Sequence, residues 1–278
     1  MTRGVPPRAL TVAGSDSGGG AGLQADLRTF LCCGVHGTCA VTAVTVQNSV
    51  GVTGVHEVPP DVVAAQVRSV VTDIGVGAAK TGMLASAPII EAVAEVVAGL
   101  GVTPFVVDPV CASMHGDPLL HPSALTALKE VLFPLATLVT PNIPEARLLT
   151  GLEVRDRAGQ EEAARALHSL GPRWVLVKGG HLPAEQEAVD VLYDGTTVTE
   201  LRAARVPTAN THGTGDTLAA ATTAWLARGL DLPAALAEGK RYVTAAVADS
   251  YPLGAGIGPV GHDWRVRPWP TPPTPPWP

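Results

Sequence analysis

The sequence GTGD at residues 213–216 places two glycines, a hydroxyl and a carboxylate at the start of a long apolar run. The first N–H groups of a helix have no partners inside the helix, and its dipole makes this end positive. An anion can bind there, because Gly213 and Gly215 would keep side chains clear of the donors that flank Thr214. Asp216 would then lie beside the anion, where it could accept the proton of an attacking hydroxyl. The alternative is an ordinary helix start with acidic capping.

Two carboxylates follow two other predicted strands. Asp108 comes directly after the apolar run 105–107, and Glu145 lies a few residues beyond the strand predicted at 137–140. Oxygen ligands that leave room for water suit Mg²⁺, so these residues are candidates for a magnesium site. Asn142, between that strand and Glu145, is also a common type of helix cap.

A lysine leaves the strand predicted at residues 174–178 and enters two glycines. Lys178 is therefore a candidate for phosphate binding, since its point charge would lie beside exposed backbone N–H groups. The alternative is a strand-end lysine that extends its ammonium group into water.

The N-terminal part of the chain contains a glycine-rich loop. Five glycines between residues 14 and 22 allow the backbone to approach a ligand closely, and the spacing is neither a P-loop nor a dinucleotide fingerprint. Asp26, one helical turn further on, could be a solvated helix residue. Gln47 offers both a donor and an acceptor to a heterocycle, or caps a loop. Met83 could line a pocket or belong to the core.

Short apolar runs alternate with segments of helical periodicity. Strands are predicted at residues 9–13, 38–46, 78–81, 105–108, 137–140 and 174–178. Helices are predicted at 23–31, 61–74, 86–98, 123–132, 144–150, 160–170, 214–228 and 233–249. Buried strands that alternate with helices indicate an α/β fold with a mainly parallel sheet covered on both faces. Asp194-Gly195, between runs 189–193 and 197–201, predicts an antiparallel hairpin at one edge.

The chain is expected to form one domain over residues 1–262, followed by a tail at 263–278. The tail is rich in proline, so it is either a loosely packed appendage or a segment that docks through Trp264, Trp269 and Trp277.

Composition excludes several classes of function. The net charge is −6 and no basic block is present, so neither nucleic acid nor an anionic membrane is an expected partner. No apolar run reaches the ~18–20 residues that span a bilayer, and residues 1–10 carry no signal-peptide core. The four cysteines, Cys32, Cys33, Cys39 and Cys111, have no metal-ligand spacing and are interpreted as small buried residues in a reducing compartment. A cytoplasmic protein is expected.

As an ordered set, these motifs resemble the ribokinase-like superfamily and, within it, the hydroxymethylpyrimidine/phosphomethylpyrimidine kinases of thiamine biosynthesis. The resemblance runs from about residue 9 to residue 262. The segments that carry it are AGSDSGGGAGLQADLRTF (13–30), VTAVTVQN (41–48), KTGML (80–84), VVDPV (106–110), TPNIPEA (140–146), VKGGH (177–181), NTHGTGDTL (210–218) and GIGPVGH (256–262).

The resemblance implies a three-layer α/β/α sandwich, a homodimer, and the use of ATP with Mg²⁺ to phosphorylate 4-amino-5-hydroxymethyl-2-methylpyrimidine and then its monophosphate. The pyrimidine pocket would comprise Gly14, Asp26, Gln47, Met83 and Val110. The nucleotide and phosphate region would comprise Thr140, Asn142 and Lys178, and the acidic positions linked to the metal would be Asp108 and Glu145. The anion hole and the catalytic position would be Gly213, Thr214, Gly215 and Asp216.

One position departs from this family. The pyrimidine kinases usually carry cysteine where this chain has Asp216, whereas aspartate is usual in the wider superfamily, including the classical pyridoxal kinases. A vitamin B6 kinase is therefore the alternative function. A non-catalytic pyrimidine sensor is a third reading, although a sensor would need none of Asp108, Glu145, Lys178 and Asp216.

Overall fold

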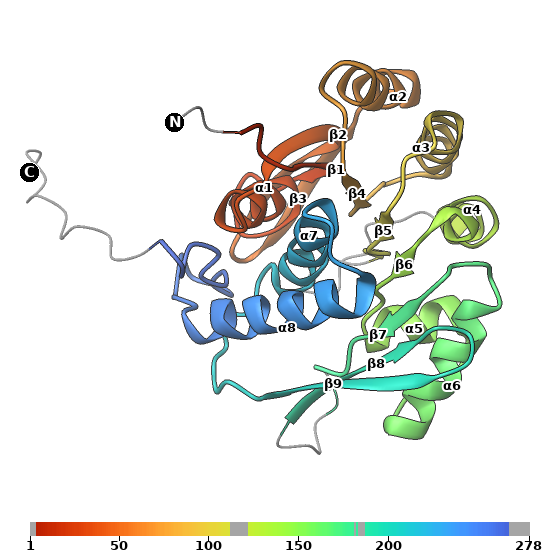
Figure 1. Ribbon diagram of the computed structural model, residues 1–278. Coiled ribbons are helices and arrows are strands. Elements are labelled where there is room, and N and C mark those ends of the chain that lie inside the picture. Colours follow the sequence, from red (N-terminus) through yellow and green to blue (C-terminus); the bar gives the residue numbers. More distant parts are fainter. Residues whose placement is uncertain (1–3, 112–121, 181, 183–186, 267–278) are drawn as a thin grey trace, which may run out of the picture.

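The structure is a computed structural model that describes residues 4–111, 122–180, 182 and 187–266 (Figure 1). Its centre is one nine-stranded sheet with the strand order β3-β2-β1-β4-β5-β6-β7-β8-β9. The strands are β1 (Arg8–Ser15), β2 (His36–Asn48), β3 (Gly51–Glu57), β4 (Ala78–Thr81), β5 (Phe105–Val107), β6 (Leu138–Val139), β7 (Val175–Val177), β8 (Glu187–Tyr193) and β9 (Val198–Ala204).

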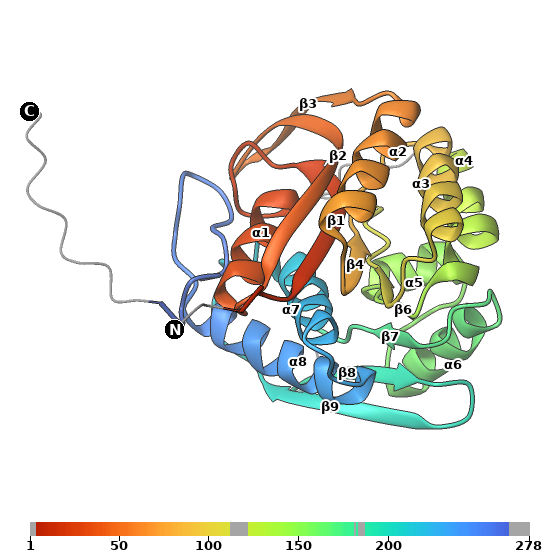
Figure 2. The same ribbon diagram turned by 45° about the horizontal axis from the view of Figure 1, so that its top comes forward.

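Helices cover both faces of this sheet, as Figures 1 and 2 show. They are α1 (Gly22–Cys32), α2 (Pro60–Ser69), α3 (Ala87–Leu100), α4 (Pro122–Ala127), α5 (Ile143–Thr150), α6 (Arg157–His168), α7 (Thr214–Ala227) and α8 (Leu232–Ala248). Helix α2 continues as a π-helical segment over Val70–Ile74, and α4 continues over Leu128–Leu132. Apolar side chains of α2 to α6 pack on one face of the sheet, and those of α1, α7 and α8 pack on the other. The predicted α/β/α sandwich is confirmed.

Strand direction follows burial. The inner strands β2, β1, β4, β5, β6 and β7 run parallel to one another, and β4 and β5 are buried along their whole length. Strands covered on both faces carry no polar alternation, which is why short apolar runs predict them. The predicted β8–β9 hairpin is present and antiparallel.

The prediction of antiparallel pairing at one edge alone was incomplete. Strand β3 pairs antiparallel with β2 and forms the opposite edge of the sheet. None of its seven residues is buried, so the segment has no apolar alternation by which a strand could be recognised. Strand β2 also extends to Asn48, so Gln47 belongs to the strand rather than to the loop that follows it.

The cysteines and the start of the tail are partly as expected. All four thiols are free; Cys33 and Cys111 are buried, whereas Cys32 and Cys39 are half-buried. Trp264 packs on Tyr242 of α8, with ring centroids 5.7 Å apart, so this tryptophan contacts its own domain. Trp269 and Trp277 lie outside the described residues. Within the described ranges, no helix is both long and apolar enough to cross a membrane.

Candidate active site

The N terminus of α7 lies beside the carboxyl ends of several parallel strands of the sheet. A Cβ atom placed on Gly82, just after β4, would lie 4.0 Å from Asp216 Oδ1. A Cβ atom placed on Gly215 would lie 3.7 Å from Asp108 Oδ2, beyond β5, and 3.2 Å from Lys178 Nζ, beyond β7. The structure therefore brings together the predicted base, phosphate-binding lysine and acidic residue, where ligands bind in open α/β sheets.

The first turn of α7 has no side-chain cap, although the Thr214 N–H donates to the Thr211 carbonyl at 3.2 Å. Gly213 is the N-cap residue, with φ +81°, and no side chain caps the helix. The Thr214 hydroxyl instead donates to the carbonyl of Thr211 at 2.6 Å and braces the preceding turn. An uncapped helix N terminus beside a lysine favours the anion site over an ordinary capped helix start.

Lys178 and Asp108 form a largely buried ion pair beside the first turn of α7. Lys178 Nζ donates to Asp108 Oδ1 at 2.9 Å, and the Thr140 hydroxyl donates to the same oxygen at 2.8 Å. Burial opposes ionisation of Asp108, but the nearby Lys178 and Lys80 hold its pKa below the usual range. Asp108 is thus a carboxylate, and its second oxygen, Oδ2, points toward the first turn of α7.

Glu145 and Asn142 cap helix α5 reciprocally. The Asn142 amide oxygen accepts the Glu145 N–H at 2.9 Å, and Glu145 Oε2 accepts the Asn142 N–H at 2.8 Å. Burial, reinforced by the charge of Asp108, raises the pKa of Glu145 to about 7. Glu145 is therefore poised between its neutral and charged forms, and an added cation would favour the charged one. The cap that the sequence suggests for Asn142 is confirmed.

The structure places Asp26 beneath the site, not at its surface. Its side chain is fully buried, and its two oxygens accept bonds from the equally buried Lys80 ammonium at 2.8 and 2.9 Å. Thr11 donates a further bond to Asp26 at 2.6 Å. Burial raises the pKa of Asp26 to about 6 in spite of this lysine. Asp26 thus belongs to the floor of the site.

Asp216 lies in a buried, highly charged environment. Burial raises the pKa of its carboxyl group, and Asp108 adds to that effect. Lys80, His212 and Lys178 act in the opposite direction. A carboxyl group whose pKa is moved toward neutrality is a better proton acceptor than an ordinary aspartate.

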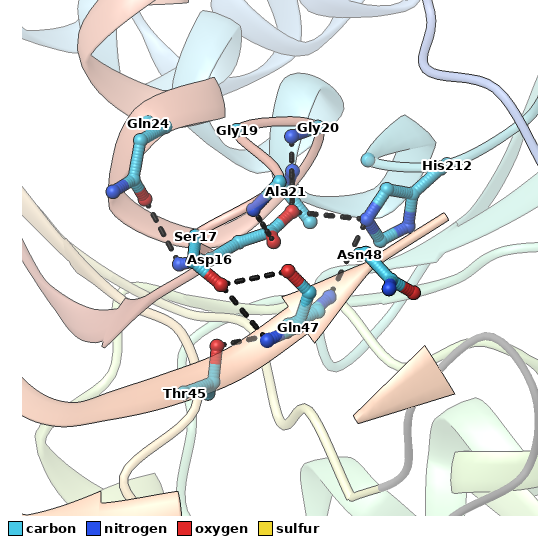
Figure 3. A network of polar contacts seen from close by, with 12 residues as sticks. Asp16, Ser17, Gly19, Gly20, Ala21, Gln24, Thr45, Gln47, Asn48 and His212 are labelled. Atoms are coloured by element: carbon cyan, nitrogen blue, oxygen red, sulfur yellow. Dashed lines mark hydrogen bonds and ion pairs between the residues drawn. The ribbon is translucent and has the colours of Figure 1, made fainter. Parts of the chain in front are cut away.

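The glycine-rich loop is held in shape by a single carboxylate, that of Asp16 (Figure 3). Its two oxygens accept the N–H groups of Gly18, Gly20 and Ala21 at 2.8, 2.9 and 2.9 Å. Oδ2 also lies 3.1 Å from Nε2 of His212, the residue before the anion hole. Burial is opposed by these bonds and by His212, which together lower the pKa of Asp16. One carboxylate therefore connects the two glycine-rich segments of the site.

The residues expected to bind the pyrimidine are close to this loop. A Cβ atom on Gly14 would lie 2.4 Å from Met83 Cε, so the glycine makes room for the methionine side chain. Gln47 Oε1 accepts a bond from Thr45 at 3.2 Å, and Gln47 Nε2 lies 3.5 Å from His212 Nε2 (Figure 3). Val110 is half-buried and packs against the larger core cluster. The structure thus places Gly14, Met83 and Gln47 on the β1–β2 side of the site, whereas Val110 follows β5.

Three residues of the site are not identified from the sequence: Asp16, Lys80 and His212. Asp16 and His212 belong to loops that become neighbours only in the folded chain, 196 positions apart. Lys80 has a detectable signal, because it is a charged residue in a four-residue strand that is otherwise apolar or small. A buried lysine needs a partner, which could have directed attention to Asp26.

Known proteins resemble this chain along most of its length. A protein from Mycobacterium tuberculosis named hydroxymethylpyrimidine/phosphomethylpyrimidine kinase is 60% identical over 262 residues, which cover 94% of this chain and 95% of that protein. The structure of a pyridoxal kinase from Bacillus subtilis, in a complex with ADP, has a TM-score of 0.88 at 40% identity and covers 95% of this chain and 100% of that one.

A phosphomethylpyrimidine kinase from Clostridium difficile also has a similar structure. Its TM-score is 0.77 at 38% identity, with coverage of 86% of this chain and 99% of that one. Residues 16–261 match the family described as phosphomethylpyrimidine kinase, and these residues include all of the site except Gly14. With the fold, the site and these matches in agreement, the chain belongs to the phosphomethylpyrimidine kinase family.

Proposed function

We propose that this protein phosphorylates the hydroxymethyl group of 4-amino-5-hydroxymethyl-2-methylpyrimidine with ATP, and then phosphorylates the monophosphate to the diphosphate, in thiamine biosynthesis. The observation that carries the proposal is the uncapped first turn of α7, with Lys178 and Asp108 beside Gly215. Family membership supports the choice of a pyrimidine alcohol as the acceptor.

The two substrates would approach the site from opposite sides. The pyrimidine would lie against Gly14, Gln47, Met83 and Val110, above the buried Asp26. The nucleotide phosphates would lie near Thr140, Asn142 and Lys178. Since α7 begins between these groups, its N–H donors face the point where the γ-phosphoryl group must pass.

The charges of the site fit a magnesium ion carried in with the nucleotide. Among the described residues, the carboxyl groups of Asp26, Asp108, Glu145 and Asp216 lie near two ammonium groups, those of Lys80 and Lys178, and a bound cation would favour their charged forms. No group of three or more His, Cys, Asp or Glu side chains in the described part of the chain forms a metal cage. Asp108 and Glu145 would therefore hold the ion in part through water and phosphate oxygens. When bound, Mg²⁺ neutralises charge on the phosphates.

The residues of this chain would then divide the chemical work. The hydroxyl oxygen of the pyrimidine attacks the γ-phosphorus, the bond from that phosphorus to ADP breaks, and the hydroxyl proton passes to Asp216. The N–H groups of Gly213, Gly215 and Asp216 and the Lys178 ammonium would stabilise the charge that develops on the phosphoryl oxygens. Positioning and charge stabilisation supply most of the catalysis in such transfers.

A competition experiment tests the proposed substrate. The protein, ATP and Mg²⁺ are mixed with the pyrimidine alcohol, its monophosphate, pyridoxal and pyridoxine, and the phosphorylated products are quantified by mass spectrometry. We expect pyrimidine mono- and diphosphates to dominate, because the family match covers both the pocket and the anion hole. Calorimetric binding of the pyrimidine without any ATP turnover would instead indicate a sensor.

A vitamin B6 kinase is the second candidate function. It is favoured by Asp216, which replaces the cysteine usual in pyrimidine kinases, and by the likeness to the B. subtilis pyridoxal kinase. The ratio of kcat/KM for the pyrimidine alcohol to kcat/KM for pyridoxal decides between the two. A clear preference for pyridoxal would reject the pyrimidine as the principal substrate.

A homodimer is also part of the proposal. Strand β3 is an edge of the sheet, and its neighbour β2 exposes Val44 and Val46 by 49% and 63% on one face. Exposed edges and apolar faces are usually covered in native proteins. Sedimentation velocity is expected to give twice the chain mass of 28.4 kDa, and Val46→Lys is expected to shift the protein toward monomer. A wild-type monomer would contradict the homodimer.

A further inference from the structure

Lys80 is a buried cation in the middle of strand β4, and the chemistry described above gives it no task. Its side chain has no exposed surface, and its ammonium group is held by both oxygens of Asp26, at 2.8 and 2.9 Å. Asp26 is fixed in turn by the Thr11 hydroxyl at 2.6 Å. The ammonium group is therefore held in one place by neighbours on β1 and α1.

This fixed charge and the Asp216 carboxylate border the same glycine. A Cβ atom on Gly82 would lie 3.6 Å from Lys80 Nζ and 4.0 Å from Asp216 Oδ1, so both groups adjoin the place that a side chain at residue 82 would occupy. The same atom would lie 3.0 Å from the Ala13 side chain, so the space is closed on its other side. Because residue 82 is a glycine, it places no side chain of its own in the space that the ammonium group and the carboxylate both border.

The charged groups around Asp216 act on its ionisation in opposite directions, and Lys80 is one of those that favour the carboxylate. Asp108 beyond β5 and the burial of the site disfavour a carboxylate at residue 216. Lys80 on β4, His212 before α7 and Lys178 beyond β7 favour it, and Lys80 contributes most of the three. Lys178 is already bonded to Asp108, whereas among the described residues the bonded partner of Lys80 is Asp26.

We propose that Lys80 is a positioning residue: its ammonium group, clamped by Asp26, holds the Asp216 carboxylate ionised and aimed at the acceptor hydroxyl. The inference rests on the proposed function, since it concerns the base of that reaction. It also assigns Asp26 an indirect task, that of anchoring the lysine. The competing explanation is structural, namely that Lys80 serves only to neutralise a buried Asp26.

Three variants separate these explanations. Lys80→Met removes the cation but leaves Asp26 without its counter-ion, and Asp26→Asn alone removes the anion but keeps the cation. The double variant Asp26→Asn with Lys80→Met removes both charges, so its interior contains no isolated ion, and thermal unfolding followed by circular dichroism verifies that it is folded. The measurement is kcat against pH, with ATP and the pyrimidine alcohol at saturation, together with KM for ATP.

We expect the acid limb of the kcat profile to lie at higher pH in Lys80→Met than in the wild type, and at higher pH in the double variant than in Asp26→Asn alone, by about one pH unit or more, because each comparison removes the cation while residue 26 stays the same. A shift of one unit lowers kcat about tenfold on the acid side and leaves the plateau at high pH less affected. KM for ATP is expected to stay within about threefold, because the cation is bonded to Asp26 and adjoins the proton acceptor at Gly82.

Each outcome bears on the proposal. A double variant with the same acid limb as Asp26→Asn alone would overturn it, because Lys80 would then be no more than a counter-ion for Asp26. Asp216→Asn provides the reference in which the limb is lost together with most of the activity. Wild-type protein that fails to phosphorylate the pyrimidine would reject the proposed function itself, and this result is visible before any variant is compared.

Discussion

Replacement of Asp216 by asparagine is expected to lower kcat by on the order of 10²–10³-fold. This is the largest loss that we expect from a single substitution in the site. The amide cannot accept the hydroxyl proton, although it occupies nearly the same volume. KM for ATP is expected to change little, because Lys178 and the α7 N–H groups remain. The measurement is the initial rate of ADP release at saturating pyrimidine alcohol.

The same variant is expected to be more stable than the wild type at neutral pH. Burial raises the pKa of Asp216, so the folded chain binds this proton more tightly than the unfolded chain does. The contribution to stability is full below the unfolded pKa of about 4 and is lost as pH rises through the higher folded value. Asparagine avoids this loss, so the Tm difference should appear near pH 7 and vanish near pH 4.

Asp216→Cys is the matched control for the predicted loss of kcat in Asp216→Asn. A thiolate can accept a proton, and cysteine is the residue that pyrimidine kinases usually carry there, so this variant should keep more activity than asparagine does. If Asp216→Asn retained near-wild-type kcat, Asp216 would not be the base, and the first turn of α7 would have only an anion-binding role.

Replacement of Gly213 by alanine is expected to cause the second-largest loss, on the order of 10²-fold in kcat, because it displaces the donors of the anion hole. A Cβ atom at residue 213 would lie 2.0 Å from the Gly20 carbonyl oxygen, so helix α7 or the glycine-rich loop must move. The left-handed φ of +81° adds a conformational cost of about 1–2 kcal/mol for any residue with a side chain.

Gly229, just beyond the other end of α7, offers a control for the conformational cost of a side chain at positive φ. It has a similar φ of +91°, and a Cβ atom there would meet nothing within 4 Å. Gly229→Ala should therefore lose a comparable free energy of unfolding in urea and retain its kcat. Equal loss of kcat in both variants would mean that destabilisation alone, and not the anion hole, explains the effect of Gly213→Ala.

The parts of the fold that the sequence predicts well are those whose burial is complete. Strand β4 has the predicted bounds 78–81, and the helix predicted at 61–74 corresponds to α2 with its π-helical continuation. Strand β3 is not predicted, because an exposed edge strand leaves no hydrophobic pattern. Its pairing with β2 depends on backbone hydrogen bonds, which every residue except proline can donate.

The contacts of the site also differ in how far the sequence predicts them. The meeting of Asp108, Lys178 and the α7 N terminus is predictable, because each follows a parallel strand or starts a helix at the same edge of the sheet. The ion pair of Lys80 with Asp26 is not, because β4 and α1 each contribute one member and only packing brings them together. Sequence position alone cannot show that Asp26 faces inward.

The contact of Asp16 with His212 also joins two segments that are made far apart in time during synthesis of the chain. Residues 14–22 leave the ribosome early, but their partner follows 196 positions later, and His212 in turn exchanges backbone bonds with Gly258 and Val260. A nascent chain that ends before residue 213 would contain the residues proposed to bind the pyrimidine, but it would lack those of the proposed anion hole. We therefore expect phosphoryl transfer only from a chain that has been made beyond residue 260. Recovery of activity after denaturation would then report that the N-terminal and C-terminal segments have come together.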